Sequence, residues 1–265
     1  MINMQKKVLV VDSDYFFVEF LSELLTKRGY GVLKAYNGKE GIALLENHTV
    51  DILFADLVLP KVDGRQLFKF IRNKYNGYQF PIVALSGIMI EQLGSLNEIG
   101  ADFFIAKGPI DQLTIKLNEF MAEFETRPFS PPVEKKILST ANVFPRRDAM
   151  ELLNSLQFHQ AVIDCAAAGI IIVDNDTRII NANPTALEII GRRSVEVLIC
   201  QVTDLFAKAE QAELVQGLKL VKRQTDMKKY SFYANLNSQM IATLISSIEL
   251  NSDTIGWVVV LQHAL

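Results

Sequence analysis

The stretch DILFADLVLPKVDG, Asp51 to Gly64, joins an apolar run to a carboxylate and then to a turn that contains proline and glycine. The run Ile52 to Ala55 is typical of a buried β-strand, and Asp56 follows it directly. A carboxylate inside such a strand would be buried without a partner, whereas one at the carboxyl end of a strand reaches the crevice where parallel α/β sheets bind ligands. We therefore expect chemistry at Asp56.

The same alternation of a short apolar run and a helical pattern occurs throughout the first half of the chain. The expected strands are Val8 to Val11, Gly31 to Ala35, Ile52 to Ala55, Ile82 to Leu85 and Phe103 to Ala106. The expected helices are Phe16 to Leu25, Lys39 to Glu46, Arg65 to Lys74, Glu91 to Ile99 and Asp111 to Phe124. This alternation predicts an α/β fold with a doubly wound, five-stranded parallel sheet.

Polar residues follow four of the five expected strands. Because crossovers between parallel strands are right-handed, the carboxyl ends of these strands meet at one edge of the sheet. The residues expected at that edge are Asp12, Ser13, Asp14, Asp56, Ser86 and Lys107. Chance would place a polar residue after one or two of the strands, so we interpret the edge as a functional site.

Four motifs at this edge resemble those of the receiver domain of bacterial response regulators, which has a flavodoxin-like fold. They are VLVVDSD, FADLVLPKVDG, PIVALSG and GADFFIAKGP, and together they are highly specific. The resemblance covers about the first 125 residues. It implies a response regulator of a two-component, phosphorelay signalling system.

The resemblance also implies a role for each residue at the edge. Asp56 is expected to accept a phosphoryl group from a histidine kinase, and a divalent cation offsets the repulsion between the two anions. Mg²⁺ prefers a few hard oxygen ligands together with water, and the family pattern assigns these to Asp12, Asp56 and the backbone carbonyl of Val58. Lys107 and the Ser86 hydroxyl are expected to contact the phosphoryl oxygens.

The same resemblance implies a switch. Movement of Ser86 towards the phosphoryl group would pull the following loop and shift a two-state equilibrium of that face of the domain. Phe104, three residues before Lys107, matches the aromatic residue that family members rotate inward. An ordinary core phenylalanine is an equally good interpretation of Phe104.

Two positions depart from the family pattern. Ser13 stands where most receivers have a second acid that binds the metal directly, so we expect reduced Mg²⁺ affinity. Asp14 is a candidate substitute ligand, and the alternative is that it caps the following helix. Gly108 stands where receivers usually have a cis-proline, and Pro109 lies one residue late.

Composition restricts the class of protein further. A net charge of -3 over 265 residues argues against a broad nucleic-acid surface. The two cysteines, Cys165 and Cys200, are too few for a disulfide framework, and we expect both in the core of a protein from a reducing compartment. No apolar run is long enough for a signal peptide or a membrane span, so a cytoplasmic location is expected.

The residues after the first half predict a linker and a second domain. Four prolines and a basic bias without periodicity mark residues 126–147 as a linker. The expected organisation is therefore a receiver domain at 1–125, the linker, and a second domain at 148–265.

The second domain resembles a PAS domain, a sensory α+β fold with a five-stranded antiparallel sheet and helices over one face. The residues that carry the resemblance are GIIIVD, the strand Arg178 to Asn183, NANPTALEIIG and the terminal GWVVVLQ. The helix expected before Gly169 commonly packs against its copy in PAS dimers, which implies a homodimer. The alternative is that this helix covers its own sheet.

PAS domains can hold haem, flavin or metabolites. His48, His159 and His263 all lie outside the central PAS helices, which argues against haem. Cys165 and Cys200 lack the Asn-Cys-Arg motif of photoactive flavin domains, which argues against that cofactor. An apolar metabolite stays possible, and an unliganded dimerisation module is favoured.

The favoured function is a response regulator that signals through protein contacts of its PAS domain and is not an enzyme beyond aspartyl-phosphate chemistry. No kinase, GGDEF or helix-turn-helix motif occurs, and no output domain is expected after the last strand. The alternatives are the amino-terminal sensory part of a hybrid histidine kinase and a phosphorylation-independent scaffold. A flavodoxin-like electron carrier is disfavoured, because acids stand where flavin phosphate would need backbone donors.

Overall fold

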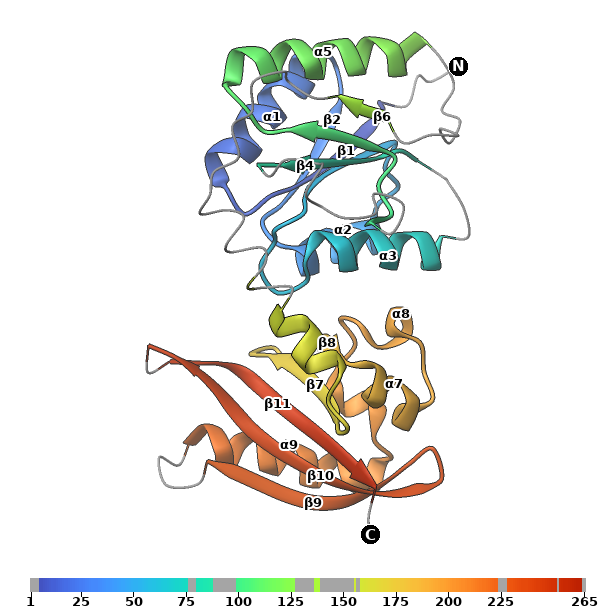
Figure 1. Cartoon of the computed structure of the whole chain (residues 1–265), viewed down its shortest axis with the longest axis vertical. Helices are drawn as coiled ribbons and strands as arrows, with labels where there is room; N and C mark the ends of the chain where they lie inside the picture. The colour runs from blue at the N-terminus through green and yellow to red at the C-terminus, as the bar shows by residue number, and fades with distance from the viewer. Residues whose placement is uncertain are drawn as a thin grey trace. The chain divides into compact units, whose positions relative to one another are not determined.

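The computed structural model describes residues 5–75, 80–87, 99–126, 136–138, 155, 158–223, 228–251 and 253–263. The chain divides into two compact units, Met1–Ser155 and Leu156–Leu265 (Figure 1). Each unit has its own sheet and its own hydrophobic core.

The first unit is a parallel sheet with helices on both faces (Figure 1). Its strands are β1 (Lys7–Val11), β2 (Gly31–Ala35), β3 (Ile52–Asp56), β4 (Ile82–Ser86), β5 (Phe103–Ala106) and β6 (Lys136–Leu138). Its helices are α1 (Tyr15–Lys27), α2 (Gly38–Asn47), α3 (Gly64–Lys74) and α5 (Ile110–Thr126). The strand order β2-β1-β3-β4-β5-β6 confirms the predicted doubly wound parallel sheet over β1 to β5.

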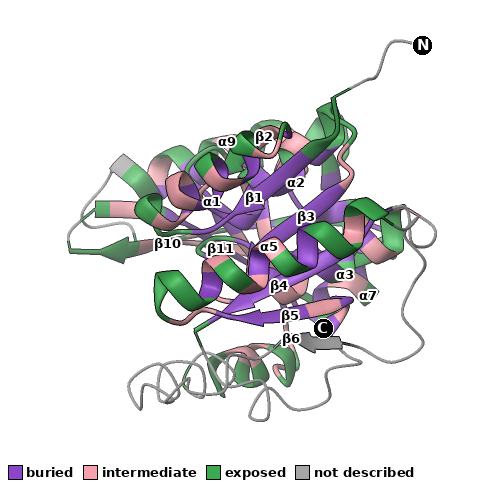
Figure 2. Ribbon diagram, turned by 90° about the horizontal axis from the view of Figure 1, so that it is seen from above, coloured by how far each residue is buried: buried purple, intermediate pink, exposed green. Residues whose placement is uncertain are grey.

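Alternation along the strands explains the two layers of helices. Val8 and Val10 face a cluster that also holds Val18 of α1 and Leu117 of α5, so these two helices cover one face. The other face carries α2 and α3, where Gly41 of α2 lies against the Val11 side chain. Figure 2 shows that burial follows the strands and the helix faces turned towards them.

One element was not expected from the sequence, and one expected element is not tested. Residues 136–138, in the segment predicted as a linker, form β6, which pairs in parallel with β5 at the edge of the sheet. Three residues are too short a run to show a strand periodicity, so the sequence offered no signal for β6. The predicted fourth helix, Glu91 to Ile99, falls almost entirely on residues 88–98, which lie outside the described residues.

The second unit is an antiparallel sheet of order β8-β7-β11-β10-β9 (Figure 1). Its strands are β7 (Gly169–Asp174), β8 (Ile179–Ala182), β9 (Lys229–Leu236), β10 (Gln239–Leu250) and β11 (Asp253–His263). Its helices are α7 (Pro184–Ile190), α8 (Ser194–Val197), the 3-10 helix η2 (Val202–Leu205) and α9 (Lys208–Arg223). These four helices contribute to one core with the sheet, which confirms the predicted antiparallel sheet covered on one face.

The expectation that both cysteines lie in the core is wrong. Cys165 is exposed just after the helical residues 158–164, and Cys200 is half-buried. A free cysteine behaves as a small apolar residue and is buried on average, but this preference does not determine whether a particular cysteine at the end of a helix faces the core or the solvent.

Asn183 joins three parts of the second unit. Its Oδ1 accepts hydrogen bonds from the backbone N–H of Ile170 in β7 (2.8 Å) and of Ala186 in α7 (2.9 Å). Its Nδ2 donates to the carbonyl oxygens of Ile163 and Ala168, both at 2.9 Å. The side chain is fully buried and therefore holds the helical residues 158–164 and their continuation against the sheet.

We predict that Asn183→Ala lowers the free energy of unfolding of the second unit by about 1–3 kcal/mol, because buried backbone groups lose their partners. The single tryptophan, Trp257, is buried in this unit, so urea unfolding followed by its fluorescence measures the effect. Asn235→Ala on exposed β9 is the matched control, and equal losses in the two variants would contradict the prediction.

Candidate functional site

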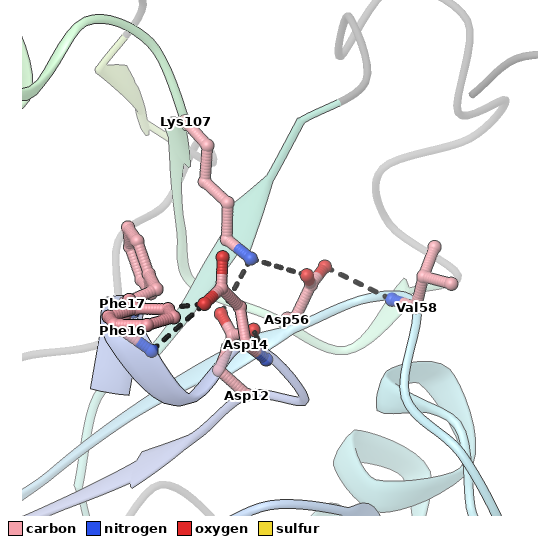
Figure 3. Close-up of polar contacts among 7 residues, drawn as sticks. All are labelled: Asp12, Asp14, Phe16, Phe17, Asp56, Val58 and Lys107. Carbon is pink, nitrogen blue, oxygen red and sulfur yellow. Dashed lines mark hydrogen bonds and ion pairs between the residues drawn. The ribbon is translucent and has the colours of Figure 1, made fainter. Parts of the chain in front are cut away.

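The ends of β1, β3 and β5 bring two carboxylates and one ammonium together (Figure 3). Lys107 Nζ lies 2.5 Å from Asp12 Oδ2 and 2.5 Å from Asp56 Oδ2. Since β1 pairs with both β2 and β3, the two carboxylates stand at the point where the strand order reverses. That point is where open α/β sheets bind ligands.

The two carboxylates differ in burial and in hydrogen bonding. The Asp12 side chain is 1% exposed and that of Asp56 is 14% exposed. Asp12 Oδ1 accepts from the Asp14 backbone N–H at 3.0 Å, and Asp56 Oδ1 accepts from the Val58 backbone N–H at 3.1 Å. Asp12 Oδ2 is buried, and the Lys107 ammonium is its ion-pair partner.

One positive charge faces two negative charges, and this imbalance affects the proton affinity of the cluster. Burial raises the pKa of Asp12, and repulsion from Asp56 adds to the rise although Lys107 opposes it. Burial alone would lower the pKa of Lys107, but attraction to Asp56 and Asp12 outweighs it and raises that pKa. The site therefore carries excess negative charge in a poorly solvated place.

Asp14 caps helix α1. Its Oδ1 accepts hydrogen bonds from the backbone N–H groups of Phe16 (2.9 Å) and Phe17 (3.2 Å), as expected of an N-cap residue. The assignment of Asp14 as a metal ligand stays a prediction, and one of its two carboxylate oxygens already accepts hydrogen bonds from the helix. Ser13, the position where a second acid was missing, is exposed.

Ser86 and Phe104 belong to the strands beside Asp56. Ser86 ends β4 and is 2% exposed, and its backbone carbonyl accepts from the Lys107 N–H at 2.7 Å. Phe104 in β5 is also buried, opposite Ala84 in the strand register. The loop that follows Ser86 and Gly87 lies outside the described residues from 88 to 98, so its predicted movement stays a prediction.

Two further residues shape the site and were not predicted from the sequence. The Lys107 ammonium lies 4.6 Å from the centroid of the Phe17 ring, but apolar spacing marks Phe17 only as a core residue of a helix. A Cβ on Gly64 would lie 2.1 Å from the Asp56 carbonyl oxygen, so α3 can begin there only with glycine. The glycine after the turn was the available signal for this close approach.

The donor set fits a magnesium ion. Within the described part of the chain, no group of three or more acidic, histidine or cysteine side chains is arranged to hold a metal. Mg²⁺, however, commonly binds one or two carboxylates and keeps several waters. Asp12 and Asp56, two carboxylates that share the single charge of Lys107, would supply those oxygens, and the Val58 carbonyl is the third predicted ligand.

Comparison with known proteins identifies both units. Residues 8–118 match the response regulator receiver domain, and residues 157–220 match a PAS domain. The chain therefore contains a receiver domain followed by a PAS domain. The predicted resemblance and its order along the chain are confirmed, while the predicted boundaries of the two domains and the linker stay predictions.

Curated relatives match part of the chain, among them three bacterial regulators. The uncharacterized transcriptional regulatory protein YcbL of Bacillus subtilis is 36% identical over 99 residues, which cover 37% of this chain and 43% of YcbL. Response regulator GtcR of Aneurinibacillus migulanus is 29% identical over 146 residues, or 54% of this chain and 58% of GtcR. The transcriptional regulatory protein CpxR of Klebsiella pneumoniae is 35% identical over 103 residues, or 38% and 42%. The chain spans about half the length of these relatives.

Among the residues that the structure describes, no helix is both long enough and apolar enough to cross a membrane.

We predict that Asp12→Asn stabilises the receiver domain at neutral pH when divalent cations are removed with EDTA. The pKa of Asp12 is raised above its ordinary value of 3.8 in the folded protein, so the folded protein still binds this proton at pH values where the unfolded chain has released it. The free energy of unfolding therefore falls as the pH rises from 3.8 through the folded-state pKa. The asparagine variant avoids this fall, and its advantage should vanish towards pH 3.8.

Thermal unfolding followed by circular dichroism over a pH series measures the difference. Asp111→Asn is the control, because Asp111 is an exposed acid in the first turn of α5 and should gain nothing. A loss of stability for Asp12→Asn at neutral pH would contradict the electrostatic account.

Proposed function

We propose that this chain is a response regulator whose Asp56 accepts a phosphoryl group from the phosphorylated histidine of a histidine kinase. The observation that carries the proposal is the position of Lys107 Nζ, 2.5 Å from both Asp12 and Asp56 at the switch point of the receiver sheet. A carboxylate nucleophile beside a fixed cation suits the transfer of an anionic group.

The transfer forms one bond and breaks another. Asp56 Oδ2 attacks phosphorus, the bond from phosphorus to the histidine nitrogen breaks, and that nitrogen keeps the electron pair. Bound Mg²⁺ supplies positive charge that offsets the repulsion between the carboxylate and the phosphoryl group. Lys107, already beside Asp56 Oδ2, needs only a side-chain rotation to follow the new phosphoryl oxygens.

Ser86 and Phe104 form the proposed switch. Ser86 ends the strand next to β3 and would donate its hydroxyl to the phosphoryl group after transfer. The direct hydrogen bond from the Lys107 N–H to the Ser86 carbonyl supports coupling between these two strand ends. A contact that exists only with the phosphoryl group in place would shift the population of the following loop.

The proposed output is signalling in the cytoplasm through protein contacts of the PAS domain, which together with its leading helix also forms the proposed homodimer. Phe158 and Val162, on the helical residues 158–164, are 67% and 50% exposed, and large apolar groups at such exposure favour a partner. His159 and His263 are exposed, so neither points into the PAS core as a haem ligand would.

A phosphorylation-independent scaffold is the second candidate. The exposed Ser13 and the capping role of Asp14 favour it, because together they leave the metal site with fewer acids than most receivers have. The two candidates differ in one result, which is whether Asp56 becomes phosphorylated.

We predict that the protein becomes phosphorylated when it is incubated with a small acyl phosphate and Mg²⁺, and that Asp56→Asn abolishes the reaction. The asparagine lacks the nucleophilic oxygen but keeps the size of the side chain. Intact-protein mass spectrometry measures the phosphoryl adduct. Asp51→Asn, five residues earlier and directly before the same strand, is the control and should react like wild type.

A wild-type protein without an adduct at saturating Mg²⁺ would contradict the phosphoacceptor proposal and favour the scaffold. An adduct that persists in Asp56→Asn would place the chemistry at another residue.

We predict that the full chain sediments as a dimer and that Phe158→Ser shifts it towards monomer, because the substitution removes an exposed apolar side chain from the proposed interface. Analytical ultracentrifugation over a concentration series measures the shift. Phe16→Ser, at an 83% exposed position of the receiver domain, is the matched control. A wild-type monomer at high concentration would rule out the dimer.

A further inference from the structure

The ammonium of Lys107 has a third neighbour besides the two carboxylates. Its Nζ lies 4.6 Å from the centroid of the Phe17 ring, within the range of a cation–π interaction (Figure 3). Phe17 comes from α1, whereas Lys107 follows β5. The lysine is therefore placed by groups from three different segments of the receiver domain.

The Phe17 ring is itself held in place. Its backbone N–H donates to the side chain of Asp14 at 3.2 Å, which fixes the first turn of α1. Its ring packs against that of Phe20, with the centroids 6.1 Å apart and the planes at 51°. Phe17 is half-buried against the core cluster of the receiver domain, so it presents a stable surface to the ammonium.

We propose that Phe17 is a positioning residue for phosphoryl transfer, and that its ring holds the Lys107 ammonium beside Asp12 and Asp56. This inference rests on the proposed function of Asp56. It also gives Asp14 a role that does not depend on metal binding, because the cap formed by Asp14 orients the turn from which Phe17 projects.

The need for a positioning residue follows from the lysine side chain. Its four-carbon stem is flexible and its ammonium can point in many directions, so a site that depends on one orientation must restrict it. The electron-rich ring face attracts a cation, and it does so more strongly where water is partly excluded. The Lys107 side chain is 20% exposed, which satisfies that condition.

The aromatic ring also avoids a cost that a third acid would impose. Asp12 and Asp56 already give the cluster more negative than positive charge, and another carboxylate near Lys107 would add repulsion against an incoming phosphoryl group. A phenylalanine stabilises the ammonium without adding a charge. Ser13 stands where most receivers have a second acid that binds the metal. Neutralisation of the phosphoryl charge therefore depends more strongly on the position of Lys107.

The first arm of the test measures the contact directly, on the full-length protein. A ring face shields protons above it, so the Lys107 Cε protons should resonate upfield of their usual position in wild type. Phe17→Leu should remove this shift, and Phe17→Tyr should keep it. Phe16→Leu is the matched control, because Phe16 is the neighbouring residue, is 83% exposed, and should leave the shift unchanged.

The second arm measures the rate of phosphorylation by a small acyl phosphate at saturating Mg²⁺. Phe17→Leu should slow the reaction by roughly three- to tenfold, the kinetic equivalent of losing one cation–π contact. Phe17→Tyr should restore the wild-type rate, and Phe16→Leu should match wild type. The thermal midpoint of each variant shows that the compared proteins are folded.

The outcomes separate this inference from the proposed function. A wild-type rate in Phe17→Leu, a rate in Phe17→Tyr as slow as in Phe17→Leu, or no upfield shift in wild type would overturn the role of Phe17 while leaving Asp56 as the phosphoacceptor. Absence of phosphorylation in every variant, wild type included, would overturn the proposed function and this role together.

Discussion

Lys107 meets two carboxylates with a single positive charge, and the arrangement of the receiver domain depends on this contact. Asp12 is almost fully buried, and a buried carboxylate without a cation would be strongly destabilising. Lys107 reduces that cost, but the cluster keeps an excess of negative charge, and burial together with the repulsion from Asp56 raises the pKa of Asp12. The same excess of negative charge favours binding of a divalent cation, so the charge that destabilises the site is also the basis of its proposed chemistry.

The contact in turn requires the observed strand order. Asp12 follows β1, Asp56 is the last residue of β3 and Lys107 follows β5, and only a parallel sheet brings these three ends to one edge. Two local features of the backbone then determine where the groups around these strand ends lie. Glycine at position 64 lets α3 begin against the Asp56 carbonyl, and the Asp14 cap starts α1 so that an aromatic ring reaches the lysine.

The amino-acid sequence predicted most of this arrangement, because the carboxyl ends of buried parallel strands meet at one edge of the sheet and bring the residues there together. Asp12, Asp56 and Lys107 were found in that way, as was the antiparallel second domain. The contact of Phe17 with Lys107 could not be predicted, since the apolar spacing of a helix is the same whether a phenylalanine packs on the core or on a lysine. The strand β6 was too short to predict. The prediction that Cys165 is buried was wrong, because residue type alone does not determine exposure.

We propose that Asp56, paired with Lys107, is the phosphoacceptor. Borohydride reduces an aspartyl phosphate to homoserine, which marks the modified residue permanently. After treatment with a small acyl phosphate and Mg²⁺, peptide mass mapping should find homoserine at position 56 and unchanged aspartate at positions 12 and 14. Homoserine at another aspartate, or at none, would contradict the account.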